Sequence, residues 1–195
     1  MMSKKEFRHA FFPSKVSTRE EQGGGKHIEG YFIVYEQETE LWPGCYEKIA
    51  RGAADSSIAN NDIRAIFNHN TDIVLGRMSA GTVNFKSDER GLYGDILVNE
   101  NDSQAMDIYA RVTRGDITGC SFGFVPIRES YTVDASDNYH WTVEEADIHE
   151  VSVCTFPAYP QTEISARKKD FEESVKRSII QRKAELKKRL EEIKC

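Results

Sequence analysis

The amino-acid sequence predicts a mixed α+β fold that is mainly antiparallel β, built on a closed or partly closed barrel flanked by helices. Short runs rich in β-branched and aromatic residues recur between turn residues, and they are typical of strands (27–36, 63–67, 92–98 and 148–156). Residues 101–114 instead repeat apolar positions three and four apart, which indicates a helix. Because many short strands would leave many unpaired edges, we expect the strands to close into a barrel.

The N-terminal part of the chain combines a polar segment with a first strand. Residues 1–26 are polar and end in a run of glycines, so we expect a flexible leader there. Residues 27–36 form the first strand of the domain. A turn at 41–44 and a short helix over 46–54 are expected next.

The centre of the chain predicts a meander followed by a helix. Strands are expected at 63–67, 73–77, 81–86 and 92–98, each separated from the next by turn residues. The helix that follows has a capping side chain available at 101–103. Gly115 suits the left-handed conformation that ends a helix.

Three more strand segments are expected before the chain changes character. Residues 122–127 form one, with Pro126 favouring a sheet edge or a bulge. Residues 131–138 have the composition of a loop, and 139–143 return as a partner strand. Residues 148–156 are the most strand-like run in this half of the sequence.

Residues 171–194 predict a long and mostly exposed helix. Ile179, Leu186 and Ile193 are seven residues apart, and Glu–Lys and Glu–Arg pairs stand four apart in the favourable order. The apolar seam spans barely three heptads, which leaves open whether the helix forms a homodimer or higher oligomer. The expected organisation is a leader at 1–26, a domain at 27–166 and a basic helix at 167–195.

The distribution of charge excludes some classes of partner. Residues 167–195 hold 11 Lys and Arg against 6 Asp and Glu, whereas residues 1–166 hold 15 against 26. An acidic body argues against nucleic-acid binding by the domain itself. The sequence has no apolar run of the length of about 18 residues that a membrane helix needs, and its start lacks the apolar region of a signal peptide.

The four cysteines predict reduced thiols. They are far apart in the sequence and form no Cys-x-x-Cys motif. This spacing favours neither a disulfide framework nor a cysteine zinc site. We therefore expect no metal and no cofactor.

A candidate nucleophile lies in the stretch Gly119-Cys120-Ser121-Phe122-Gly123. Glycines on both sides of Ser121 allow sharp backbone conformations and close approach of a substrate. The same pattern also occurs by chance in ordinary turns. An α/β-hydrolase elbow is excluded, because the residues after Ser121 lack a helical period and the chain lacks repeated βαβ units.

Two further residues could complete a catalytic set with Ser121. His69 ends an apolar strand among polar residues, where it can face a cleft or act as a surface or capping residue. Glu150 lies in an apolar strand, where alternation puts it on one face with Ser152 and Cys154. A buried carboxylate needs a partner, although an edge strand with Glu150 facing water fits the pattern equally well. The other histidines are weaker candidates for the base: His9, His27, His140 and His149.

Seven short motifs follow one another across residues 27–166. They are Glu29-Gly30-Tyr31, Pro43-Gly44-Cys45-Tyr46, Phe67-Asn68-His69-Asn70, Leu75-Gly76-Arg77, Gly91-Leu92-Tyr93, the stretch from Gly119 to Phe124, and Glu150-Val151-Ser152-Val153. In this order they resemble the prohead (procapsid) maturation proteases of tailed bacteriophages, which are related in fold to the herpesvirus assembly protease. The resemblance implies a herpesvirus-protease-like β-barrel core.

The resemblance also implies a serine endopeptidase in which Ser121 is the nucleophile, His69 the base and Glu150 the third member. The herpesvirus relatives have a histidine as the third member of the triad. His149 and His140 are therefore the next candidates for that role in this chain. Members of the family often have an aspartate after the catalytic histidine, where this chain has Asn70.

The biological role that the resemblance implies is cleavage of scaffold and capsid-protein extensions, and of the protease itself, inside the immature capsid in the host cytoplasm. The implied partners are the major capsid protein and the scaffolding protein. The alternatives are a non-enzymatic capsid assembly or scaffolding protein and an unrelated small serine esterase.

Overall fold

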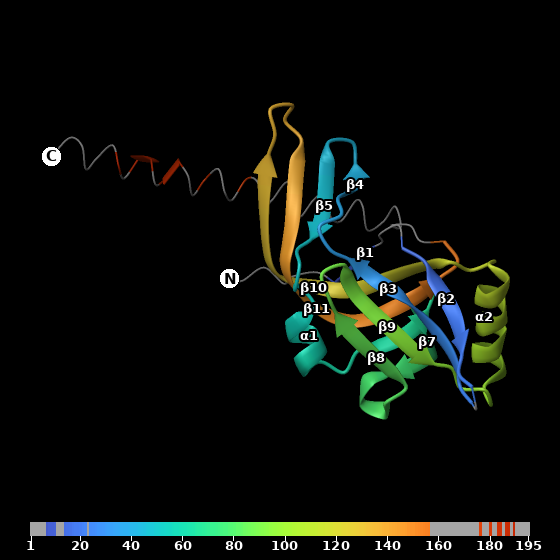
Figure 1. The fold of residues 1–195 in the computed structure, drawn as a ribbon. Coiled ribbons are helices and arrows are strands. Elements are labelled where there is room, and N and C mark those ends of the chain that lie inside the picture. Colours follow the sequence, from blue (N-terminus) through green and yellow to red (C-terminus); the bar gives the residue numbers. More distant parts are fainter. Residues whose placement is uncertain are drawn as a thin grey trace. The chain divides into compact units, whose positions relative to one another are not determined.

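Two β-sheets form the framework of the domain in the computed structural model (Figure 1). The structure describes residues 7–10, 14–22 and 24–156, and seven single positions between 176 and 189. In the first sheet the order is β1-β10-β11-β5-β4, with β6 joined to β11 and β7 to β6. Its strands are β1 (Arg8–Ala10), β4 (Thr39–Trp42), β5 (Cys45–Ile49), β6 (Arg64–Phe67), β7 (Asn70–Arg77), β10 (Gly119–Val133) and β11 (Tyr139–Cys154). The second sheet has the order β2-β3-β9-β8, formed by β2 (Val16–Glu20), β3 (Lys26–Val34), β9 (Gly91–Leu97) and β8 (Val83–Ser87).

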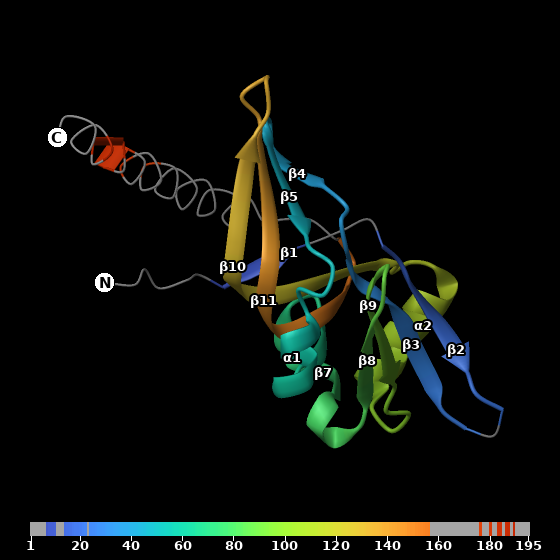
Figure 2. The same cartoon turned by 60° about the vertical axis from the view of Figure 1, so that its left-hand side comes forward.

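The long hairpin of β10 and β11 ties the first sheet together. Residues 119–124 of β10 are buried, whereas most of the strand beyond Pro126 is exposed. The register shifts after Gly123 and on both sides of Arg128, and such bulges bend a strand. The outer half of the hairpin therefore projects from the body of the domain, with β5 and β4 beside it (Figure 2).

The strand β11 makes the first sheet mixed. It is antiparallel to β10 but parallel to β5 through its outer part and to β6 through its inner part. In the inner part Glu150 lies opposite Arg64, and Val153 lies opposite Phe67 at the end of β6. The turn that follows β6 is thereby brought beside the buried end of β11.

The hydrophobic core joins the inner half of the hairpin to the second sheet and to helix α2 (Ser103–Arg114). Its largest fully buried side chains include Phe32, Phe122, Phe124, Ile28, Ile33 and Ile148. Helix α2 buries its apolar face, and Asp102 caps its first turn by accepting hydrogen bonds from the backbone of Gln104 and Ala105. Gly115 ends it with a left-handed φ of 87°. The short helix α1 (Asp55–Asn60) packs on β11, and the 3-10 helix η1 (Met78–Ala80) follows β7.

Several local predictions are confirmed. The helix expected at 101–114 is α2, with its predicted cap and stop. Strands occur where 27–36, 63–67 and 92–98 predicted them, and Pro126 lies beside a bulge. The strands expected at 139–143 and 148–156 are the two ends of the single strand β11.

The predicted fold class is wrong. Among the described residues from 7 to 156, the strands form two open sheets and no closed barrel, most residues lie in strands, and the α-helices are α1 and α2. The bend in the long hairpin and the parallel partners of β11 divide the strands between two sheets, so closure is unnecessary. No long C-terminal helix is among these elements. The positions described between 176 and 189 are each helical, and the rest of that segment lies outside the described residues.

Two further expectations also differ from the structure. The helix predicted at 46–54 is replaced by β5, which alternates between buried and half-buried residues because it pairs with β4 and β11. The segment predicted as a flexible leader contains β1 and β2, which pair with β10 and β3. The chain divides into two compact units, Met1–Tyr159 and Pro160–Cys195.

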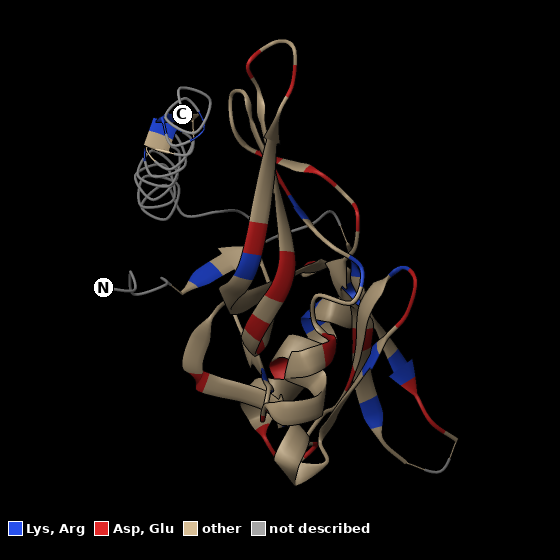
Figure 3. Ribbon diagram, turned by 90° about the vertical axis from the view of Figure 1, so that its left-hand side faces the viewer, with Lys and Arg blue, Asp and Glu red and all other residues tan. Residues whose placement is uncertain are grey.

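Acidic positions occur on several elements of the described part of the domain. Figure 3 shows Asp and Glu positions on the hairpin, the strands and the loops, with Lys and Arg among them. This distribution agrees with the acidic balance of residues 1–166. Among the helices of the described residues, none has the length and apolar character needed to cross a membrane.

Candidate active site

One face of the strands β1, β10 and β11 gathers the candidate site residues. Gly123 of β10 lies opposite His9 on β1 and opposite Glu150 on β11. Ser121, two residues earlier on β10, lies opposite Ser152. Residues opposite one another on neighbouring strands point to the same side of a sheet, and so do residues two apart. His9, Ser121, Glu150 and Ser152 therefore share one face.

Gly123 provides the space in which this face is assembled. A Cβ atom at this position would lie 2.5 Å from Glu150 Oε1 and 2.5 Å from Phe7 Cζ. The glycine thus lets the carboxylate of Glu150 lie over β10. From there Oε1 reaches to within 3.7 Å of His9 Nε2 on the far side.

His69 is carried by a two-residue turn between β6 and β7. Asn68 and His69 have φ values of 51° and 58°, and positive φ at both central residues is the geometry of a type I′ turn. The turn is held against β11, because Asn68 N–H donates to Val153 O at 3.0 Å and His69 N–H donates to Ser152 Oγ at 3.1 Å. A non-glycine residue with positive φ is costly, so the fold holds His69 in a strained position.

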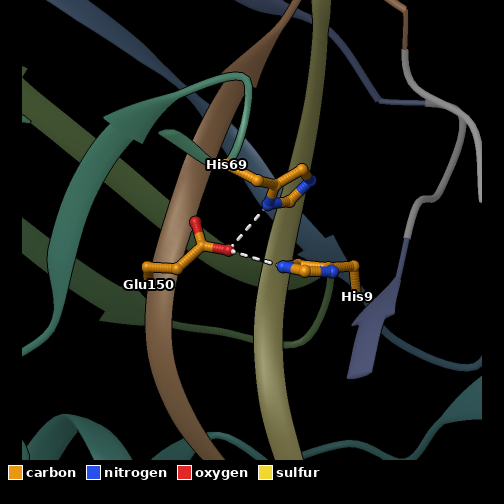
Figure 4. A group of neighbouring side chains, drawn as sticks. All are labelled: His9, His69 and Glu150. Carbon is orange, nitrogen blue, oxygen red and sulfur yellow. Dashed lines mark hydrogen bonds and ion pairs between the residues drawn. The ribbon is translucent and has the colours of Figure 1, made fainter. Parts of the chain in front are cut away.

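The side chains of His69 and Glu150 form a hydrogen-bonded pair (Figure 4). Nδ1 of His69 lies 2.7 Å from Glu150 Oε1. The other carboxylate oxygen accepts a hydrogen bond from Ser152 Oγ at 2.8 Å. Since an ionised carboxylate only accepts, the proton of a neutral His69 is on Nδ1, and Nε2 is left as the acceptor. That is the tautomer a general base needs.

Ser121 shares a face with this pair, but its hydroxyl is bonded elsewhere. Ser121 is only 4% exposed, and its Oγ donates a hydrogen bond to the backbone carbonyl of Ala10 on β1 at 2.8 Å. Ser152, which faces Ser121 across the strand pair, contacts both Glu150 and His69 Nδ1. The structure therefore brings His69 and Glu150 together and places Ser121 on the same face, one strand away.

Comparison with known proteins shows the family of the chain. Residues 14–177 match the family described as caudovirus prohead serine protease. The chain belongs to this family. It is also similar to the prohead protease of Enterobacteria phage HK97, with 31% identity over 151 residues that cover 75% of this chain. The chain spans 63% of the length of that relative. The search of solved structures gave no significant match.

In the described part of this prohead serine protease family member, the thiol nearest to the His69 imidazole is a poor nucleophile. Cys154 Sγ lies 3.9 Å from His69 Nε2, within the described part of the chain. Burial raises the pKa of Cys154 to about 12, and burial likewise raises the pKa of Cys120 to about 12. A thiol with such a pKa is almost wholly protonated at neutral pH and attacks slowly. The local chemistry therefore favours a hydroxyl over a thiolate.

The remaining histidines are engaged elsewhere on this family member. His27 Nδ1 lies 2.6 Å from Asp95, and His140 Nδ1 lies 2.9 Å from Glu38. His149 is exposed and lies 3.3 Å from Asp147. Of the residues that the structure describes, His69 and His9 are the histidines that contact Glu150.

Sequence reasoning missed three contributors to the site. His9 lies in the segment that the sequence predicts to be a flexible leader, and the sequence patterns give Ser152 no role. Gly123 is expected only to loosen the backbone beside Ser121, whereas in the structure it makes room for the carboxylate of Glu150. A pocket of about 580 Å³ adjoins Glu150, with Phe7, Ile66 and Val74 in its wall. The alternation on β11, which placed Ser152 beside Glu150, was the signal that could have found Ser152.

Proposed function

We propose that this chain is a serine endopeptidase that cleaves scaffold and capsid-protein extensions, and itself, during procapsid maturation. Membership of the prohead protease family supports the reaction class and the setting. The observation that carries the proposal is the 2.7 Å contact between His69 Nδ1 and Glu150 Oε1, made on the face that also bears Ser121.

Each residue has a defined role in this proposal. Ser121 Oγ attacks the peptide carbonyl carbon, and His69 Nε2 takes the hydroxyl proton. His69 then gives that proton to the leaving amine, which departs and leaves an acyl group on Ser121. Water, activated by the same imidazole, hydrolyses the acyl-enzyme. Glu150 holds the Nδ1–H tautomer and stabilises the imidazolium, while Ser152 holds Glu150.

The proposal requires one rearrangement of the resting site. The hydroxyl of Ser121 now donates to Ala10 O, so it must leave that carbonyl before it can donate to His69 Nε2. Catalytic hydrogen bonds are often absent from the free enzyme and form only when substrate is bound. The contact with β1 therefore describes a resting state of the nucleophile.

The proposed substrates are the major capsid protein and the scaffolding protein, and the proposed place of action is the immature capsid in the host cytoplasm. The acidic balance of residues 1–166 supports a protein substrate over nucleic acid. The basic segment from 167 to 195 is proposed to dock the enzyme to capsid or scaffold proteins.

Co-expression with the major capsid protein and the scaffolding protein tests the function. The wild-type chain should shorten these proteins, and Ser121→Ala should abolish the shortening while the chain is still incorporated into procapsids. Ser130→Ala is the matched control. Ser130 lies on the same strand, but in the outer half of the hairpin, where its hydroxyl donates a hydrogen bond to Glu144. Shortening by Ser121→Ala at the wild-type rate contradicts the assignment. Absence of shortening by the wild-type chain favours the non-enzymatic alternative.

A further inference from the structure

Three potential metal ligands converge at the candidate active site (Figure 4). His9 from β1, His69 from the turn between β6 and β7, and Glu150 from β11 each offer one ligand atom. All of these atoms lie within 4.8 Å of one another. The rings of His9 and His69 are 4.0 Å apart between centroids. Three distant parts of the sequence therefore present nitrogen and oxygen ligands to one small volume.

The set of ligands matches the preference of Zn²⁺. Two imidazoles and one carboxylate bind zinc in catalytic sites, at about 2.0–2.2 Å, and leave a fourth position for water. Two such ligands around a tetrahedral ion lie about 3.4 Å apart. The separations from Glu150 Oε1 are 3.7 Å to His9 Nε2 and 2.7 Å to His69 Nδ1. Small side-chain movements would therefore bring all three atoms into range of one ion.

The surroundings also suit a metal site. Ser152 Oγ donates to Glu150 Oε2, which orients the carboxylate and leaves Oε1 for the ion. Such hydrogen bonds to the far side of a ligand strengthen metal binding. Gly123 clears the space over β10 in which the ligands meet. The backbone of His9 is fixed by the pairing of β1 with β10, in which His9 lies opposite Gly123.

We propose that His9 Nε2, His69 Nδ1 and Glu150 Oε1 bind Zn²⁺, and that the bound ion switches the protease off. The ion takes the place of the hydrogen bond between His69 and Glu150. A metal on Nδ1 requires the proton of neutral His69 to be on Nε2, so that this nitrogen can no longer accept the proton of Ser121. The inhibition rests on the proposed function, whereas the binding of zinc does not.

The ion would also fasten β1 over the nucleophile. His9 belongs to the same strand as Ala10, whose carbonyl accepts the hydrogen bond from Ser121. Zinc held jointly by β1 and β11 therefore favours the resting state in which that hydroxyl is occupied.

Zinc binding is measured on the full chain by competition between the protein and a chromophoric zinc indicator. The wild-type chain should bind one ion at this site, and His9→Ala should lower the affinity at least about tenfold. His27→Ala is the matched control, because it removes a histidine that is also paired with a carboxylate, but on the second sheet. His9→Gln keeps a polar side chain in β1, and its zinc affinity is measured as well, in case His9→Ala folds poorly. Equal affinity in the wild type and both His9 variants overturns the proposal.

Further measurements separate the binding of zinc from the inhibition of cleavage. Ser121→Ala should bind zinc as the wild type does, so binding can be read even if the proposed function fails. Peptide cleavage by the wild type should fall as zinc is added, and the zinc concentration for half inhibition should rise at least about tenfold in His9→Ala. With Co²⁺ as probe, a thiolate-to-metal charge-transfer band would place Cys154 among the ligands and overturn the proposed set. A cobalt spectrum without that band supports it.

Discussion

Replacing His69 with glycine should leave the domain more stable than replacing it with alanine, although both changes abolish activity. His69 occupies the second central position of a two-residue turn, at a φ of 58°. Glycine adopts this conformation without steric cost, and Asn-Gly is the preferred pair for a type I′ turn. Histidine stands where the turn alone would favour glycine, which is the pattern expected when a functional side chain is required.

The difference in the free energy of unfolding between the two variants follows from the backbone contributions in which glycine and alanine differ. Both variants lose the bond to Glu150 and keep the backbone bond from residue 69 to Ser152 Oγ. The left-handed conformation costs alanine about 1–2 kcal/mol. The greater freedom of glycine in the unfolded chain offsets about 0.4–1 kcal/mol of this. The glycine variant should therefore be more stable by about 0.5–1 kcal/mol, or about 1–4 °C in Tm.

Thermal and urea unfolding of His69→Gly and His69→Ala, with peptide cleavage measured in parallel, test this prediction. The same two substitutions at Asp72 are the control, because Asp72 is exposed in β7 and its φ is not positive. There alanine should be the more stable variant. An alanine variant at position 69 that is as stable as the glycine variant would show that the turn is not strained. Residual cleavage near the wild-type rate would remove His69 from the mechanism.

Two further substitutions and one labelling measurement probe the same region. Glu150→Gln keeps the shape of the side chain but removes its charge, and it should lower kcat at least about 100-fold; a loss below tenfold contradicts its role. Gly123→Ala should strongly lower the rate of cleavage while changing Tm little, because the new Cβ displaces the flexible side chains of Glu150 and Phe7. Unchanged cleavage would show that the position of the carboxylate is unimportant. Cys120 and Cys154, with pKa values raised to about 12, should resist iodoacetamide at pH 8 in the folded protein and react after unfolding, as peptide mapping would show.

Local sequence patterns predicted the elements whose cause is local. The helix α2 has its apolar period, its cap at Asp102 and its stop at Gly115 within one continuous stretch, so nothing distant is needed to form it. The alternation in β11 placed Glu150 and Ser152 on one face, and the structure has them on one face.

Features that depend on distant pairing were not predictable from those patterns. Residues 46–54 have some helical character, but β5 is fixed by its partners β4 and β11. His9 gains its place at the site only because β1 pairs with β10, more than a hundred residues away. The prediction of a closed barrel was wrong for the same reason, because the division of the strands between two sheets is set by the bulges and by the parallel partners of β11.

The most direct test of the central claim is covalent labelling of the nucleophile. The zinc-free chain is treated with a fluorophosphonate, which reacts with activated serine hydroxyls, and the modified residue is identified by peptide mass spectrometry. The proposed mechanism predicts one adduct, on Ser121, that is lost in His69→Ala and retained in the control Ser130→Ala. An adduct on Ser152, or labelling of Ser121 that is unchanged without His69, would contradict it.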